Sequence, residues 1–297
     1  MTPRAPRRFH ALPLILLALL LAGCVPVPGT ASVPTITLEP LPTPTETPLP
    51  MAVIVNGEGI SRAEFDSELA RYQQAQSGLG NTVSLETATQ VVMQNFVDML
   101  LLVQAAGAYG FTVEDASLQS RIDSLAADAG GAEALAAWMT AHGYTRQEFE
   151  TTLRREIAAA WMRDQVTASV APTAEQVHVK QILLYNEGKA QEALGYLQAG
   201  WNFEDLAAQY DPVAKGELGW FPRGYLPSLA IEEAAFALQP GQTSAILQDE
   251  SGYHILYVIE RDPARQLSPD ALLTLQEQAF RTWLNQRRNE STILYPP

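Results

Sequence analysis

Hydrophobic and polar residues alternate in two stretches of the second half of the chain. Residues 177–185 and 253–259 are rich in β-branched and apolar side chains and follow the two-residue period of strands. In the second stretch this period places Tyr253 and Ile255 on one face and His254 and Leu256 on the other. Two segments between these predicted strands, residues 188–200 and 203–210, carry apolar residues at helical spacing. The pattern predicts a small sheet covered by helices.

The first half of the chain follows the period of helices instead. Residues 51–60 are typical of two short strands joined by an Asn56-Gly57 turn. Ser61 with Glu64, and Thr145 with Glu148, have the spacing of capping boxes at helix starts. Ser268 and Pro269 are typical of the cap and the first position of a further helix. We expect this helix to pack on the earlier helices, because its apolar stripe would otherwise lie in solvent. The predicted helices span about 61–76, 84–109, 113–129, 132–142, 145–168 and 268–288.

Charge and composition exclude several classes of partner and site. The net charge is −14, from 19 basic and 33 acidic residues, and no basic cluster follows the N-terminus. Nucleic acid is therefore not an expected partner. A single cysteine excludes an intramolecular disulfide. Residues 51–170 show no titratable cluster with the spacing of a metal site or a catalytic triad, and we expect neither a metal nor a cofactor.

The N-terminus has the features of an export signal. Arg4, Arg7 and Arg8 precede an apolar run at 11–22, which is too short to span a membrane as a helix. The sequence Leu-Ala-Gly-Cys that ends at Cys24 resembles the lipobox of bacterial lipoproteins. The resemblance implies a signal peptide over 1–23 and a lipid on Cys24. The alternative is a plain secretory signal followed by an incidental cysteine.

Residues 24–50 are rich in proline and threonine. Such a segment cannot form a packed core and favours extended, polyproline-like conformations of about 3.1 Å per residue. The composition predicts a tether that holds the following domains away from a membrane. The alternative is a proline-rich ligand for a recognition domain.

Three blocks within the sheet region carry a family resemblance. They are GELGWFPRG at 216–224, EEAAFALQPG at 232–241 and SGYHILYV at 251–258. The first block is glycine-rich and indicates a turn, the second indicates a short helix followed by a turn, and the third indicates a strand. In order and spacing they resemble the parvulin family of peptidyl-prolyl isomerases over about residues 174–262. The resemblance implies an α+β fold, with a small antiparallel or mixed sheet covered by helices. It also implies isomerisation of X-Pro bonds.

The resemblance assigns catalytic roles to His254, Gln181 and Asp211. His254 matches the second family histidine, and the alternative is an ordinary strand histidine. Gln181 stands where the family has its first histidine, and it can hydrogen-bond to His254 but cannot titrate. His178 is three residues from Gln181, so strand alternation places it on the opposite face. Asp211 is the nearest candidate for the family's loop acid, although with Pro212 it can also form a turn in this short loop.

The resemblance also assigns a proline-binding cup to three apolar residues. Leu226 falls at the family's methionine, and Ile231 and Phe236 fall at its two aromatic positions. All three positions are apolar here, although one aromatic ring is lost and one residue is added between Gly224 and Phe236. The alternative for Phe236 is a place in the core.

Residues 53–68, VIVNGEGISRAEFDSE, resemble the start of the N-terminal chaperone domain of SurA/PrsA-type foldases. The expected domains are a helical chaperone domain at 51–170, an isomerase domain at 174–262 and a helix within 266–297 that packs on the chaperone domain. The resemblance implies a lipid-anchored isomerase on the extracytoplasmic face of a bacterial membrane that acts on unfolded secreted polypeptides with X-Pro bonds. The alternative is a non-catalytic holdase with a degenerate parvulin-like domain.

Overall fold

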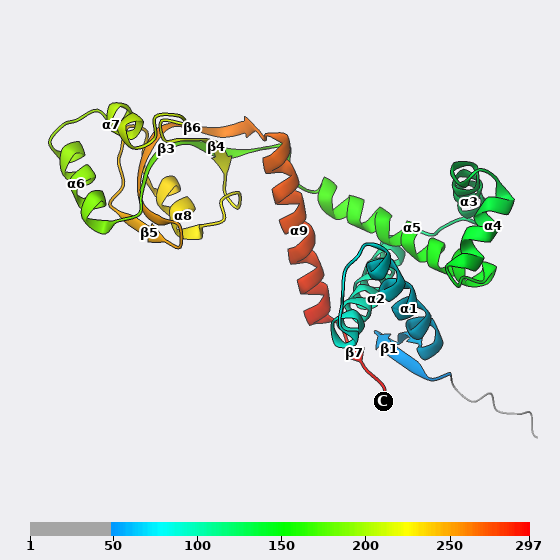
Figure 1. Ribbon diagram of the computed structural model, residues 1–297. Helices are drawn as coiled ribbons and strands as arrows, with labels where there is room; N and C mark the ends of the chain where they lie inside the picture. Colours follow the sequence, from blue (N-terminus) through cyan, green and yellow to red (C-terminus); the bar gives the residue numbers. More distant parts are fainter. Residues whose placement is uncertain (1–48) are drawn as a thin grey trace, which may run out of the picture. The chain divides into compact units, whose positions relative to one another are not determined.

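A computed structural model describes residues 49–297 (Figure 1). The predicted signal peptide, the lipidation site at Cys24 and nearly all of the predicted tether lie outside the described residues. In chain order the elements are β1 (Met51–Val55), β2 (Glu58–Ser61), α1 (Arg62–Gly78), α2 (Leu85–Ala108), α3 (Asp115–Ala129), α4 (Ala132–Ala141), α5 (Arg146–Ala168), β3 (Thr173–Leu184), α6 (Glu187–Gln198), α7 (Phe203–Tyr210), β4 (Glu217–Pro222), α8 (Leu229–Ala237), β5 (Leu247–Asp249), β6 (Gly252–Gln266), α9 (Pro269–Glu290) and β7 (Ile293–Leu294).

The expected N-terminal hairpin is present and gains a third strand. Asn56 and Gly57 both have positive φ, which is the geometry of a two-residue hairpin turn between β1 and β2. On its other edge β1 pairs with β7, whose first residue, Ile293, lies four residues before Pro297. The sequence did not indicate β7, because two residues are too short for an alternating pattern to register.

The helix starts follow the predicted capping residues, with one difference. Thr145 and Glu148 form a complete capping box at the start of α5. At α1 the Ser61 hydroxyl accepts from the Glu64 N–H, but the Glu64 carboxylate accepts a hydrogen bond from Arg155 instead of returning to Ser61. The second half of the predicted box at Ser61 is therefore replaced by an ion pair between α1 and α5.

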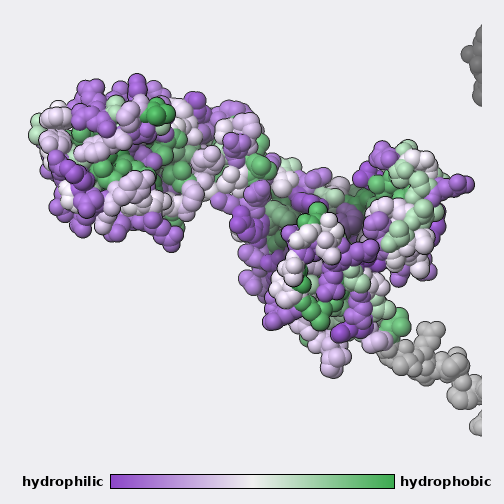
Figure 2. Space-filling model, viewed as in Figure 1, coloured by the Kyte–Doolittle hydropathy of each residue, from purple (hydrophilic) through white to green (hydrophobic). Residues whose placement is uncertain are grey.

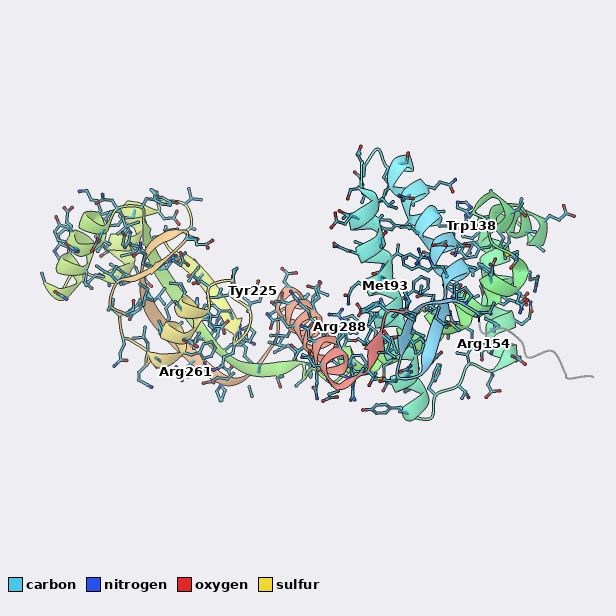
Figure 3. The ribbon with its side chains drawn as sticks, turned by 90° about the horizontal axis from the view of Figure 1, so that it is seen from below. Met93, Trp138, Arg154, Tyr225, Arg261 and Arg288 are labelled. Atoms are coloured by element: carbon cyan, nitrogen blue, oxygen red, sulfur yellow. The ribbon has the colours of Figure 1, made fainter. Side chains whose placement is uncertain are left out.

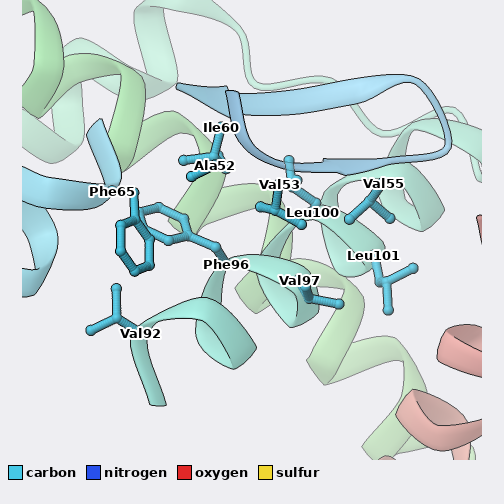
Figure 4. Close-up of a cluster of buried hydrophobic side chains, with 10 residues drawn as sticks. All are labelled: Ala52, Val53, Val55, Ile60, Phe65, Val92, Phe96, Val97, Leu100 and Leu101. Carbon is cyan, nitrogen blue, oxygen red and sulfur yellow. The ribbon is translucent and has the colours of Figure 1, made fainter. Parts of the chain in front are cut away.

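A buried cluster joins the hairpin to α1 and α2 (Figure 4). Phe65 of α1 and Phe96 of α2 lie with their ring centroids 6.3 Å apart at its end. By length and composition α2 could cross a membrane, but its residues Leu100 and Leu102 are buried in two separate clusters of the described part. Its apolar character is therefore accounted for by core packing.

Helix α9 is tied to α2 and α5. Ser268 caps it and Pro269 occupies its first turn, as the sequence predicted. Leu284 lies in a buried cluster with residues of α2 and α5, including Leu102 and Met162. Near its end, the guanidinium of Arg288 (labelled in Figure 3) makes two hydrogen bonds of 2.8 and 2.6 Å to the carboxylate of Asp98 in α2.

The second sheet has four strands in the order β4-β3-β6-β5, and all their pairings are antiparallel. One face packs against α8 and the other against α6 and α7. The glycine-rich stretch that the sequence indicated as a turn carries β4, so this expectation was wrong for residues 217–222. On the face shown in Figure 2, hydrophilic residues cover most of the surface. Helices around small antiparallel sheets confirm the predicted α+β class.

Candidate active site

His254 lies on β6 and is 5% exposed. It is the β6 partner of Leu183, and the next pair on this face joins Gln181 to Leu256. This is the face that α8 covers, because Leu256 and Val258 belong to the same cluster as Ile231 of α8. Both ring nitrogens of His254 have partners: Nδ1 is 2.9 Å from Oε1 of Gln181, and Nε2 is 2.9 Å from Oδ1 of Asp249.

Asp249 was not recognised from the sequence. It ends β5 and faces Gly252 across a tight β5–β6 hairpin, which brings its carboxylate back over His254. The hydrogen bond from His254 lowers the pKa of Asp249 to about 2, with further contributions from the Ser251 N–H and Ser228. The only sequence signal was an acid five residues before His254, ahead of a Ser-Gly turn.

The negative charge of Asp249 determines that the Nε2 atom of His254 carries a proton. At neutral pH Asp249 is ionised, so its oxygen only accepts and the Nε2 of His254 carries the proton between them. The Gln181 amide can accept from Nδ1 or donate to it, so it can serve His254 in either protonation state. The predicted hydrogen bond between Gln181 and His254 is present.

Gly216 holds the backbone of Gln181. The Gln181 N–H donates to the Gly216 carbonyl at 2.7 Å, and Gly216 has φ of 70°. A Cβ on Gly216 would lie 2.1 Å from the Gln181 carbonyl oxygen, so no other residue fits without a backbone shift. The first glycine of the glycine-rich block therefore sets the position of a candidate site residue.

Asp211 lies apart from His254. Its Oδ1 accepts the N–H groups of Val213 and Ala214 at 3.2 and 2.9 Å, which is the turn alternative considered for this residue. Since Gln181 and Asp249 take both nitrogens of His254, Asp211 holds neither. Asp211 and Gln181 nevertheless line one cavity of about 390 Å³.

The three predicted cup residues differ in exposure. Ile231 and Phe236 are each 4% exposed and belong to the core under α8, whereas Leu226 is half-buried at its edge. The Phe236 ring lies edge-on to Phe221, with centroids 6.2 Å apart, and the Arg223 guanidinium lies 4.1 Å over it. Of the three side chains, Leu226 has the most surface to offer a ligand.

Glu232 is a further residue that the sequence did not single out. Its buried carboxylate accepts the N–H groups of Gly224, Tyr225 and Leu226 at 2.7, 3.0 and 3.1 Å. These bonds fix the loop that carries Leu226 onto α8. Arg261 (labelled with Tyr225 in Figure 3) donates to the carbonyls of Phe236 and Leu238, at the other end of α8.

His178 lies on the opposite face of β3, as strand alternation predicted. Its ring stacks on Trp220 at 5.2 Å and its Nε2 is 2.6 Å from the Glu217 carboxylate. Among residues 49–297, no group of three or more His, Cys, Asp or Glu side chains is arranged to hold a metal ion. The groups that the described site offers are the hydrogen-bonded side chains of Gln181, His254 and Asp249 and the apolar surface of Leu226.

Comparison with known proteins adds two family matches. The model described as SurA-like N-terminal domain matches residues 15–163, and the model described as PPIC-type PPIASE domain matches residues 185–260. Chaperone SurA of Methylobacillus flagellatus is 29% identical over 206 residues, which cover 57% of this chain and 47% of that protein. Foldase protein PrsA of Halalkalibacterium halodurans is 35% identical over 113 residues, which cover 36% of this chain and 34% of that protein. The chain therefore matches less than half the length of each relative.

A solved structure is also similar. The crystal structure of peptidylprolyl isomerase PrsA from Bacillus cereus matches with a TM-score of 0.44 and 22% identity, over 77% of this chain and 82% of that chain.

Proposed function

Because this chain belongs to the SurA/PrsA-type foldases that contain a parvulin-type domain, we propose that it is a peptidyl-prolyl cis-trans isomerase that assists the folding of extracytoplasmic polypeptides. The observation that carries the proposal is the hydrogen-bonded set of Gln181, His254 and Asp249 on the sheet face that also carries the cup residues. Its substrates are unfolded or partly folded chains with X-Pro bonds.

Isomerisation of an X-Pro bond needs no nucleophile. The barrier of about 18–20 kcal/mol comes from amide resonance, which is lost in the twisted transition state. A less polar surrounding favours the twisted state because it is less charge-separated. In the proposed mechanism Leu226 supplies apolar contact to the proline ring, while Ile231 and Phe236 support that contact from the core. Gln181 and His254 provide the hydrogen-bonding groups on the polar side of the site, and Asp249 fixes the orientation of His254.

The second candidate is a holdase without isomerase activity. Two observations favour it: residue 181, where the parvulin resemblance places a histidine, is a glutamine that cannot titrate, and Ile231 and Phe236 are almost fully buried. The helical part of the chain would then bind unfolded polypeptides without catalysis.

An isomerisation assay with an Ala-Pro peptide separates the two candidates. We expect the purified protein to accelerate isomerisation, and a thousandfold acceleration corresponds to about 4 kcal/mol of barrier. If isomerisation stays at the uncatalysed rate while the protein still suppresses aggregation of an unfolded protein, the holdase candidate is correct.

We also propose the domain arrangement and the anchor. Residues 1–23 are a signal peptide, Cys24 carries lipid, and 24–50 form a tether to the extracytoplasmic face of the membrane. A chaperone domain at 51–170, an isomerase domain at 174–262 and a C-terminal segment at 266–297 follow. Contacts of α9 with α2 and α5 support the assignment of that segment to the chaperone domain.

Substitution of Cys24 tests the anchor. We expect Cys24→Ser to move the protein out of the membrane fraction, because stable anchoring needs acyl chains that serine cannot receive by this route. A variant that stays in the membrane fraction with unchanged mass would contradict lipidation at Cys24.

A further inference from the structure

One edge of β3 ends its pairing early. On this edge β4 pairs with β3 only from Gln176 to Lys180, while on the other edge β6 continues to Leu184. The Gln181 N–H still reaches Gly216 on the β4 side, so by alternation the N–H and C=O of Leu183 point to that same side. Within residues 49–297, no strand pairs with β3 there beyond Lys180. An unpaired strand edge is a template for another extended chain.

The cavity of about 390 Å³ lies along this open edge. Gln181, Ile182 and Leu183 form one wall of it. Other lining residues come from the end of α7, the following loop and the start of β4: Ala207, Tyr210, Asp211, Pro212, Ala214, Gly216 and Glu217. Tyr185 at the end of the edge is 83% exposed and Val213 in the loop is 93% exposed. The cavity therefore combines the open backbone edge of β3 with an exposed aromatic side chain, Tyr185, while Val213 lies in the loop beside it.

The two charged residues that line the cavity are both acidic. Its lining includes the carboxylates of Asp211 and Glu217 and no lysine or arginine. Asp211 accepts hydrogen bonds from two backbone N–H groups through Oδ1 alone, and the Glu217 carboxylate contacts the His178 ring through Oε1. Each carboxylate keeps a second oxygen that these bonds do not use. A cationic side chain complements such a lining.

We propose that an extended segment of unfolded polypeptide, with a lysine or arginine near its proline, adds to β3 as a strand along residues 181–184. Backbone pairing at Leu183 holds the segment, and Asp211 and Glu217 bind its cationic side chain. Gln181 lines this cavity and also hydrogen-bonds to His254, so the bound segment lies next to the candidate active site. The inference rests on the proposed function, since it specifies the substrate class of that site.

Peptide binding tests the charge preference. Three peptides share a central Ala-Pro, and their flanking residues are lysine, glutamine or glutamate. We expect the lysine peptide to bind roughly tenfold more tightly than the glutamate peptide at low ionic strength, with the glutamine peptide between them. Added salt should reduce the difference. Asp211→Asn and Glu217→Gln should each reduce it, whereas Glu192→Gln, the same change of charge on α6 outside the cavity, should not.

Amide hydrogen exchange tests the strand pairing. We expect the lysine peptide to slow exchange at Leu183, whose N–H points to the open edge, and to leave Ile182 unchanged, because its N–H points to β6. A peptide with N-methylated backbone amides should lose this protection. Equal affinity for the three peptides, or unchanged exchange at Leu183, would overturn the inference. Protection at Leu183 that depends on protein concentration alone would also overturn it, because it would indicate pairing between two copies of the protein.

Binding is measured apart from catalysis, so the two proposals can fail separately. Isomerisation of an Ala-Pro peptide with no charge preference and no protection at Leu183 would leave the isomerase proposal standing without this docking edge. If the lysine peptide binds more tightly than the glutamate peptide and protects Leu183, but no peptide is isomerised, the proposed strand pairing at β3 stands and the isomerase proposal is wrong.

Discussion

The two faces of the four-stranded sheet each hold a histidine beside a carboxylate, but the two pairs differ in what surrounds them. The side chain of His254 is 6% exposed, its second nitrogen is bonded to Gln181, and α8 covers its face. The side chain of His178 is 24% exposed and stacks on Trp220. A short histidine–carboxylate distance is therefore not evidence of a functional site by itself. Burial and a second polar partner distinguish His254.

The largest expected effect, on the free energy of unfolding, comes from replacing the buried phenylalanine that packs against each face of the sheet. Phe236→Ala and Phe203→Ala should each lower the free energy of unfolding by about 3–5 kcal/mol, because both side chains are buried. Under conditions where both variants remain folded, only Phe236→Ala should weaken substrate binding, since it supports Leu226 on the His254 face. Denaturant unfolding and isomerisation kinetics check this. Equal loss of binding in both variants would remove the functional difference between the faces.

Replacement of each histidine compares the two pairs directly. His254→Ala should lower isomerase activity roughly tenfold or more and the free energy of unfolding by about 1–3 kcal/mol, because it leaves Gln181 and Asp249 without their partner. His178→Ala should change both much less, because its contact with the Glu217 carboxylate is partly exposed to solvent. Similar losses of activity in the two variants would contradict the assignment of the site to the His254 face.

Gln181→Ala should have a smaller effect than His254→Ala. It removes one hydrogen bond, so the free energy of unfolding should fall by about 1 kcal/mol, while the bond between His254 and Asp249 persists. Unfolding in urea and activity measured with the same Ala-Pro peptide test this. A loss of activity equal to that of His254→Ala would show that Gln181 acts as more than support for His254.

The smallest expected effect appears only in acid. Asp249 has a pKa of about 2 in the folded protein, below the value of about 3.9 for an unfolded aspartate. Its contribution to stability is therefore fully present above the unfolded pKa and is lost as the pH falls from about 4 towards 2. Unfolding measured from pH 5 to pH 2 should be less pH-dependent in Asp249→Asn than in the wild type. Parallel pH dependence in the two proteins would show that Asp249 is not held by His254 in solution.

Local patterns predicted the features that depend on near neighbours in the sequence. The caps at Thr145 and Ser268 and the Asn56-Gly57 turn follow from side chains within a few residues of each other. The pairing of Gln181 with His254 followed from strand alternation together with the parvulin resemblance. These features need a period and a spacing, which the sequence contains.

Features that depend on register between short elements were missed. Asp249 reaches His254 only through the register of a three-residue strand, and β5 is too short to show alternation. The strand at 217–222 was hidden because the glycines in and around it indicate a turn, although one of them, Gly216, permits a close approach to β3. Glu232 lies in the quoted EEAAF block, but its three backbone partners come from a loop whose path the sequence does not specify.

The pairing of β7 with β1 has a consequence for the order in which the chain folds. Asn56 and Ser291 are 235 residues apart in the chain and are joined by a hydrogen bond. Closing a flexible loop of that length costs about 5 kcal/mol of entropy, so this sheet gains little until the segments between its ends have folded. In the export that we propose, the chain crosses a membrane from its N-terminus, so β1 emerges well before its partner β7. The first strand to emerge is then among the last to have both of its edges paired.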